Sequence, residues 1–205
     1  MNRRYSKLID DLAAQSWAVA HDLLPRDAVA ALADEARRLW TAGCFKQAGI
    51  GRGAEHQVRR DVRGDQILWL NERELTPAQA RYWDEIESLR VELNRELFLG
   101  LESIEAHYAV YPPGTFYRKH VDRFSNAGER VISCTLYLNP NWRDEDGGQI
   151  RLYIADERIE VSPSSGTFVI FRSDEVPHEV LPADWYRFSL TGWFRRRSIR
   201  SILDF

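Results

Sequence analysis

The sequence predicts an antiparallel β-sandwich or barrel with helices covering one face, and three observations lead to this fold class. Apolar residues recur at helical spacing from residue 6 to about residue 100. From residue 104 onward, short runs rich in β-branched and aromatic residues are separated by Gly, Pro, Asn or Asp. Six such runs follow one another, as is typical of antiparallel sandwiches and barrels. We therefore expect a mostly β protein whose helices lie in its N-terminal half.

Three helices are expected before residue 100. The second follows Pro25 and ends near Gly43, and the third begins at Thr76-Pro77, a favourable N-cap and first-turn pair. The apolar positions that mark the successive helices are Leu8, Ile9 and Leu12; Val29, Leu32, Ala36 and Leu39; and Tyr82, Ile86, Leu89, Leu93 and Leu97. A long glycine- and arginine-rich stretch separates the second helix from the third and becomes strand-like around residues 67–70. A connection of this length is more often functional than passive.

The remaining elements are strands. The six runs cover residues 104–111, 130–139, 147–154, 158–162, 166–171 and 185–194. We expect a single domain over residues 1–205, with helical support in 1–100, a β core over about 104–195 and a short basic C-terminal tail.

Composition excludes several classes of protein. The chain of 205 residues is 44% hydrophobic and 29% charged, as in ordinary globular proteins. A net charge of −3 argues against nucleic acid as a required partner. No apolar run is long enough to cross a membrane, and the N-terminus lacks a signal-peptide core. Cys44 and Cys134 are far apart, so they predict small, wholly or partly buried side chains in a reducing compartment. We expect a cytoplasmic monomer.

Three residues could hold a metal ion. His120 and Asp122 are two positions apart, so on an extended segment both project to the same side. Antiparallel returns can bring His178 back beside them. Two imidazoles and one carboxylate on one face leave open positions, as in non-haem Fe(II) oxygenases. Zinc is the competing metal, because the same ligands occur in hydrolytic sites.

Arg187 stands in the middle of the last predicted strand. Alternation places it with Ser189, Thr191 and Trp193 on one face, whereas the other face is apolar. Burying an arginine is costly unless it meets an anion, and a dicarboxylate would provide one. An exposed arginine paired with a nearby acid is the alternative. Ser133, Thr135 and Tyr137 form a second polar face that could line a pocket.

Several ordered motifs together resemble one family. They are YPPG at 111–114, HVD at 120–122, LYLN at 136–139, GGQIRLY at 147–153, VPHEVLPADWYRFSLTGWF at 176–194 and RGDQILW at 63–69. They resemble the 2-oxoglutarate-dependent prolyl hydroxylases. The nearest branch contains the hypoxia-inducible-factor prolyl hydroxylases and bacterial enzymes that act on elongation factor Tu. The resemblance covers about residues 50–194.

The resemblance implies a double-stranded β-helix, or jelly-roll, core. It implies Fe(II) on His120, Asp122 and His178, with 2-oxoglutarate and O₂ as co-substrates and ascorbate as reductant. Residues implied to bind or enclose 2-oxoglutarate are Arg187, Tyr137, Thr191, Tyr111, Ile150 and Trp193.

The resemblance also suggests substrate contacts. The segment from residue 49 to residue 65 matches a loop that closes over a peptide substrate, and Asp65 and Arg130 match a pair that can link this loop to the core. An ordinary surface salt bridge is the alternative for that pair. His107 departs from the family, which has an apolar residue there. It could contact substrate or be a satisfied core histidine.

The function implied is hydroxylation of a prolyl residue in a protein, with elongation factor Tu as the favoured substrate and succinate and CO₂ as by-products. Two alternatives remain open. One is a hydroxylase of a free amino acid or other small molecule, and the other is a non-catalytic metal-binding β-sandwich protein. No nucleic acid or membrane is required by any of the three.

Overall fold

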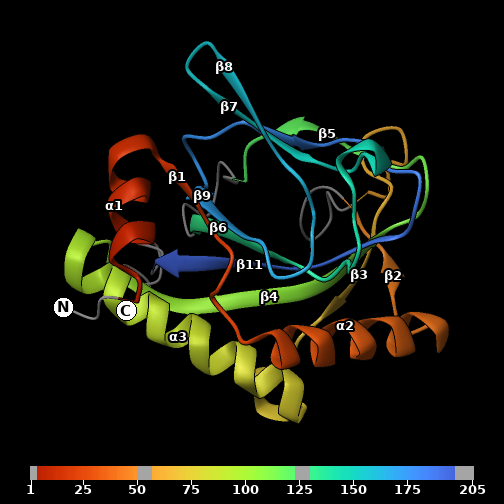
Figure 1. Cartoon of the computed structure of the whole chain (residues 1–205), viewed down its shortest axis with the longest axis horizontal. Helices are drawn as coiled ribbons and strands as arrows, with labels where there is room; N and C mark the ends of the chain where they lie inside the picture. The colour runs from red at the N-terminus through yellow and green to blue at the C-terminus, as the bar shows by residue number, and fades with distance from the viewer. Residues whose placement is uncertain (1–3, 50–56, 123–129, 197–205) are drawn as a thin grey trace, which may run out of the picture.

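The computed structural model describes residues 4–49, 57–122 and 130–196. Within these ranges it contains three α-helices and eleven strands, arranged as two antiparallel sheets with the helices on one side (Figure 1). Part of the long connection, including His56, and the basic tail after Arg196 lie outside the described residues. None of the described helices is long and apolar enough to span a membrane.

The three predicted helices are present. They are α1 (Ser6–Gln15), α2 (Arg26–Thr41) and α3 (Pro77–Leu97). The predicted start of α3 is confirmed, because the Thr76 hydroxyl accepts a hydrogen bond from the Gln79 backbone and the Gln79 side chain accepts one from the Thr76 backbone. Such reciprocal capping satisfies two backbone donors that the first turn would leave free.

The larger sheet has seven strands in the order β1-β9-β6-β11-β4-β3-β2. Their bounds are β1 (Trp17–Ala20), β9 (Phe168–Arg172), β6 (Arg130–Tyr137), β11 (Arg187–Arg196), β4 (Leu101–Tyr111), β3 (Gln66–Trp69) and β2 (Lys46–Gln47). The central strand, β11, pairs over almost its whole length with both β4 and β6.

The smaller sheet has four strands in the order β5-β10-β7-β8. These are β5 (Tyr117–His120), β10 (His178–Val180), β7 (Ile150–Ile154) and β8 (Glu157–Val161). In Figure 1 they lie on the side of the larger sheet opposite the helices. The two facing antiparallel sheets agree with the expected jelly-roll core.

Strand alternation divides the interior into two layers. On β11, Phe188, Leu190 and Phe194 point into the apolar core beneath the helices, as predicted. The apolar stripes of the helices fill the same core, including Leu12, Leu32 and Ile86. The opposite face of β11 points between the sheets, where smaller apolar clusters include Phe171 and Val180. Polar side chains on that face therefore project into the space that the two sheets enclose.

Candidate active site

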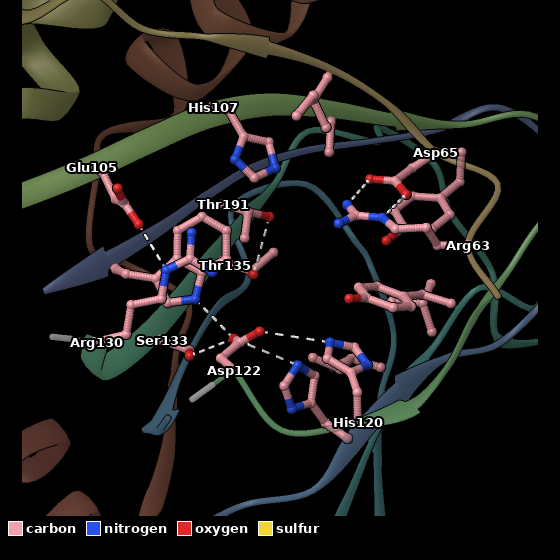
Figure 2. A pocket seen from close by; sticks show the side chains of 18 of the residues that line it. Arg63, Asp65, Glu105, His107, His120, Asp122, Arg130, Ser133, Thr135 and Thr191 are labelled. Carbon is pink, nitrogen blue, oxygen red and sulfur yellow. Dashed lines mark hydrogen bonds and ion pairs between the residues drawn. The ribbon is translucent and has the colours of Figure 1, made fainter. Parts of the chain in front are cut away.

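A cavity of about 450 Å³ opens between the two sheets (Figure 2). The larger sheet contributes residues of β3, β4, β6 and β11, and the smaller sheet contributes residues of β5, β7 and β10. The cavity holds all three predicted metal ligands together with Arg187. Segments far apart in the sequence thus supply one site.

His120, Asp122 and His178 come together as predicted. His178 lies directly opposite His120 in the pairing of β10 with β5. The Asp122 backbone N–H donates to the Ser173 carbonyl, 3.1 Å away, which fixes the residue just after β5. The candidate ligand atoms of the three residues all lie within 4.8 Å of one another. This spacing fits one metal ion.

Backbone contacts orient both imidazoles for metal binding. His120 Nδ1 lies 2.7 Å from the Arg118 carbonyl oxygen, and His178 Nδ1 lies 3.1 Å from that of Val176. A carbonyl oxygen only accepts, so Nδ1 carries the proton in each ring. Each Nε2 then faces Asp122, 3.6 Å from its Oδ1 for His120 and 3.7 Å from its Oδ2 for His178. In a neutral ring this contact leaves the lone pair on Nε2, which is the tautomer that a metal requires.

Asp122 is held in the charged state. Ser133 Oγ and Trp193 Nε1 donate to its Oδ2 over 2.6 and 2.8 Å, so Oδ1 is the oxygen left for a metal. Burial by itself would raise the pKa of Asp122, but His178, His120 and the Ser133 hydrogen bond hold it well below its usual range. Burial lowers the pKa of His178 to about 4. A carboxylate and neutral imidazoles are the forms that bind metal.

Arg187 is buried, with only 2% of its surface exposed. Its Nε donates to the Gly148 carbonyl over 2.8 Å, and its guanidinium lies 5.0 Å from the Tyr111 ring and 4.8 Å from that of Tyr137. Within the described parts of the chain, no carboxylate lies within 4.0 Å of it. The alternative of an exposed ion pair is therefore wrong. A buried guanidinium that meets no anion among the described residues indicates a site for an anionic ligand.

The other predicted pocket residues surround the same space. Tyr111, Ile150, Thr191 and Trp193 line the cavity. Tyr137 lies behind it, fully buried, and its hydroxyl has no hydrogen-bond partner among the described residues. A buried hydroxyl beside a buried guanidinium could donate to the same anion.

Comparisons with known proteins agree with this geometry. A family model described as the 2OG-Fe(II) oxygenase superfamily matches residues 106–195. A Pseudomonas putida prolyl-4-hydroxylase structure is 45% identical, with a TM-score of 0.84, and the match covers 94% of this chain and 99% of that one. Human prolyl hydroxylase EGLN3 is 30% identical over an alignment of 169 residues that covers 78% of this chain and 70% of the relative.

The chain belongs to the prolyl hydroxylase family. It resembles a further solved structure, a Trichoplax adhaerens prolyl hydroxylase in complex with a peptide fragment of the hypoxia-inducible factor oxygen degradation domain. That match has 27% identity and a TM-score of 0.82, and covers 92% of this chain and 87% of the other. The chain spans only 27% to 54% of the length of four other curated relatives that it matches.

In this member of the prolyl hydroxylase family, the expected pairing of Asp65 with Arg130 is replaced by two other ion pairs. Asp65 is fully buried and accepts two hydrogen bonds from Arg63, over 2.7 and 2.5 Å. Arg130 donates to Glu105 over 2.7 Å and lies 3.5 Å from the centroid of the Trp193 ring. The alternative of a surface salt bridge is also wrong for Asp65, because its carboxylate is buried. A contact of Asp65 or Arg130 with substrate stays a prediction.

Arg63 and Tyr117 are among the cavity residues that the sequence patterns did not single out. Arg63 lies 4.4 Å from the Tyr117 ring centroid, and the Tyr117 ring stacks on His120 with centroids 3.6 Å apart. Arg63 therefore contacts Tyr117, and the Tyr117 ring packs directly on the candidate metal ligand His120. The available signal was the i, i+2 spacing of Arg63 and Asp65 just before β3, which is the spacing that drew attention to His120 and Asp122.

Proposed function

We propose that this chain is an Fe(II)- and 2-oxoglutarate-dependent dioxygenase that hydroxylates a prolyl residue of a protein substrate. The observation that carries the proposal is Arg187, a buried cation without a described protein anion, facing the same cavity as two histidines and an aspartate. A bound metal ion would account for the two histidines and the aspartate but not for Arg187. An oxoacid co-substrate would account for Arg187, because its carboxylate would be the missing anion.

The residues fit the implied metal and co-substrate. His120, Asp122 and His178 would hold Fe(II), and three protein ligands leave open coordination positions. Iron and 2-oxoglutarate would supply the oxidising chemistry, in which O₂ turns 2-oxoglutarate into succinate and CO₂ while one oxygen atom enters a substrate C–H bond. Ascorbate is the reductant that we expect to keep the iron in its ferrous state.

The chain's own contribution is binding, orientation and exclusion of water. Arg187 neutralises the far carboxylate of 2-oxoglutarate, and the hydroxyls of Tyr137 and Thr191 add hydrogen bonds. Support comes from the burial of Arg187, the unpartnered Tyr137 hydroxyl and the position of Thr191 on the cavity wall. Tyr111, Ile150 and Trp193 enclose the co-substrate with apolar and aromatic surface. With the co-substrate enclosed in this way, each ionic contact would be stronger than in water.

Elongation factor Tu is the protein substrate that we favour. The sequence motifs are what favour this protein. The 45% identity to the Pseudomonas putida prolyl-4-hydroxylase and the relative whose structure contains a bound peptide support a prolyl residue of a protein as the target in general. We further propose that the chain acts as a monomer in the cytoplasm, where this substrate is found.

Mass spectrometry tests the proposal. The chain is incubated with Fe(II), 2-oxoglutarate, ascorbate and elongation factor Tu under air, and we expect succinate together with one added oxygen on a single prolyl residue. The Asp122→Ala variant should produce neither. Succinate without oxidised elongation factor Tu would contradict the substrate but keep the enzyme class, whereas oxidation of free proline would favour the small-molecule alternative. Absence of succinate would contradict the activity itself.

A further inference from the structure

His107 lines the cavity wall but belongs to neither the metal site nor the 2-oxoglutarate site proposed above. Its side chain is 3% exposed, and its Nδ1 has no hydrogen-bond partner among the described residues. An unsatisfied buried polar atom costs about 1–3 kcal/mol. Because Nδ1 is enclosed by protein atoms, Nε2 is the ring nitrogen through which His107 can reach a ligand in the cavity.

Two indole rings hold the imidazole of His107 in place. The ring centroid of Trp69 lies 4.8 Å from that of His107, and the ring centroid of Trp193 lies 5.3 Å from it. Trp69 is 48% exposed, whereas Trp193 donates to the candidate metal ligand Asp122. His107 therefore lies between an aromatic residue open to solvent and the metal end of the cavity. With the ring so packed, its polar edge is what remains for a ligand.

His107 begins a polar row across three neighbouring strands. Thr191 of β11 is directly opposite His107 of β4 and directly opposite Thr135 of β6. The two threonine hydroxyl oxygens lie 3.3 Å apart, and all three residues line the cavity. Figure 2 shows His107 and the two threonines projecting into the cavity above Asp122.

The imidazole offers a donor without a charge. Burial, followed by repulsion from Arg63 and Arg130, lowers the pKa of His107 to about 3, so the ring is neutral and carries one N–H. Proline has no backbone N–H, so a peptide at a target proline presents carbonyl oxygens to the pocket. A neutral N–H donor matches such an oxygen and leaves no buried charge unpaired.

We infer that His107 is a substrate-binding residue that donates a hydrogen bond to a peptide carbonyl oxygen next to the target proline. Thr191 and Thr135 continue the polar row beside this contact. The inference rests on the proposed prolyl hydroxylase function and adds to it the residue that recognises the peptide backbone at the reacting position.

Steady-state kinetics and binding test the inference together. His107→Phe keeps a ring between the two indoles but removes the N–H, whereas His107→Asn restores a donor. We expect the Phe variant to raise the KM for elongation factor Tu about 3- to 10-fold, with kcat and the KM for 2-oxoglutarate within about twofold of the unsubstituted chain. His107→Asn should recover part of the loss. His21→Leu is the matched control, since His21 is exposed and does not line this cavity.

A binding readout without turnover accompanies the kinetics. Calorimetry of elongation factor Tu with each variant, loaded with Mn(II) and 2-oxoglutarate without oxygen, should show the same weakening. Thermal melts establish that each variant is folded, and His107→Leu replaces His107→Phe if the latter is not. An unchanged KM and affinity for elongation factor Tu, or a rise in the KM for 2-oxoglutarate instead, would overturn the inference while leaving the proposed function standing. An unsubstituted chain that neither forms succinate nor oxidises elongation factor Tu would overturn the proposed function and this inference with it.

Discussion

At the residue scale, Arg187 differs from the other two arginines that line the cavity. Arg63 is paired with Asp65 and Arg130 with Glu105, but the described residues offer Arg187 a carbonyl oxygen and two aromatic rings. Its burial without an anion among the described residues should therefore weaken the ligand-free chain, and under the proposed function 2-oxoglutarate would supply the missing anion.

This difference leads to a prediction for Arg187→Met. Removing one partner of a buried charged pair costs about 2–5 kcal/mol of binding, so the KM for 2-oxoglutarate should rise about 30-fold or more. The ligand-free variant should be about as stable as the unsubstituted chain, because the buried charge is gone. Urea denaturation measures the stability, and initial rates of succinate formation give the KM. A variant with normal 2-oxoglutarate affinity and a severe loss of stability would show that Arg187 has a structural role instead.

At the scale of elements, the turn that leads into β7 positions the Arg187 side chain. Gly148 has a φ of +71°, and its carbonyl accepts the hydrogen bond from Arg187 Nε. A Cβ on Gly148 would lie 2.9 Å from the Cβ of Ala183 and 3.2 Å from the Cδ of Arg187. The turn can thus accept no side chain without moving the arginine.

We therefore expect Gly148→Ala to combine two defects. Left-handed backbone strain costs about 1–2 kcal/mol and overpacking about 1–3 kcal/mol, and the displaced arginine should raise the KM for 2-oxoglutarate. Gly43→Ala is a matched control, because Gly43 has a φ of +73° but nothing within 4 Å of the added Cβ. In chemical denaturation, the Gly43→Ala variant should lose only the free energy of unfolding that corresponds to backbone strain. Its KM for 2-oxoglutarate should not change. Equal effects of both substitutions on the KM would contradict this role of the turn.

The elements also show where sequence patterns were sufficient. Long periodic segments such as α3 and β11 were predicted with their buried faces, because many positions repeat the same signal. β1, β2 and β10 were not predicted as strands, since two to four residues are too few for alternation to appear. The prediction for Cys44 as at least partly buried was wrong, because that residue is exposed, whereas Cys134 is buried.

In the candidate site, too, sequence patterns predicted some features and not others. The convergence of the three candidate metal ligands and the burial of Arg187 could be predicted from spacing and from a charge on an apolar strand. The true partners of Asp65 and Arg130 could not, because only the packed structure decides which of the chain's acids and arginines meet.

At the scale of the whole molecule, the site joins the two sheets. His120 and His178 belong to the smaller sheet, whereas Arg187 belongs to the larger one. A metal and 2-oxoglutarate held across the cavity would therefore resist separation of the sheets. Ligand at about 100 times its Kd adds about 2.7 kcal/mol, which corresponds to a rise in Tm of about 5–10 °C for a chain of this size.

Differential scanning fluorimetry with Mn(II) and 2-oxoglutarate checks this expectation. Both ligands together should raise the Tm, and EDTA should reverse the rise. Asp122→Ala should abolish it, although that variant contains Arg187. A rise that persists in Asp122→Ala would mean that 2-oxoglutarate binds away from the candidate metal centre.

The position of β11 affects how the chain acquires its structure. It is the last described strand in sequence, yet it is the middle strand of the larger sheet and separates β4 from β6. Until β11 has been synthesised and inserted, a nascent chain has two unpaired edges facing each other and lacks Arg187. Sheet closure is therefore a late, non-local event, and such events are slow because distant segments must meet first. The ability to bind 2-oxoglutarate should appear only when that last insertion is complete, so ligand binding reports the finished fold.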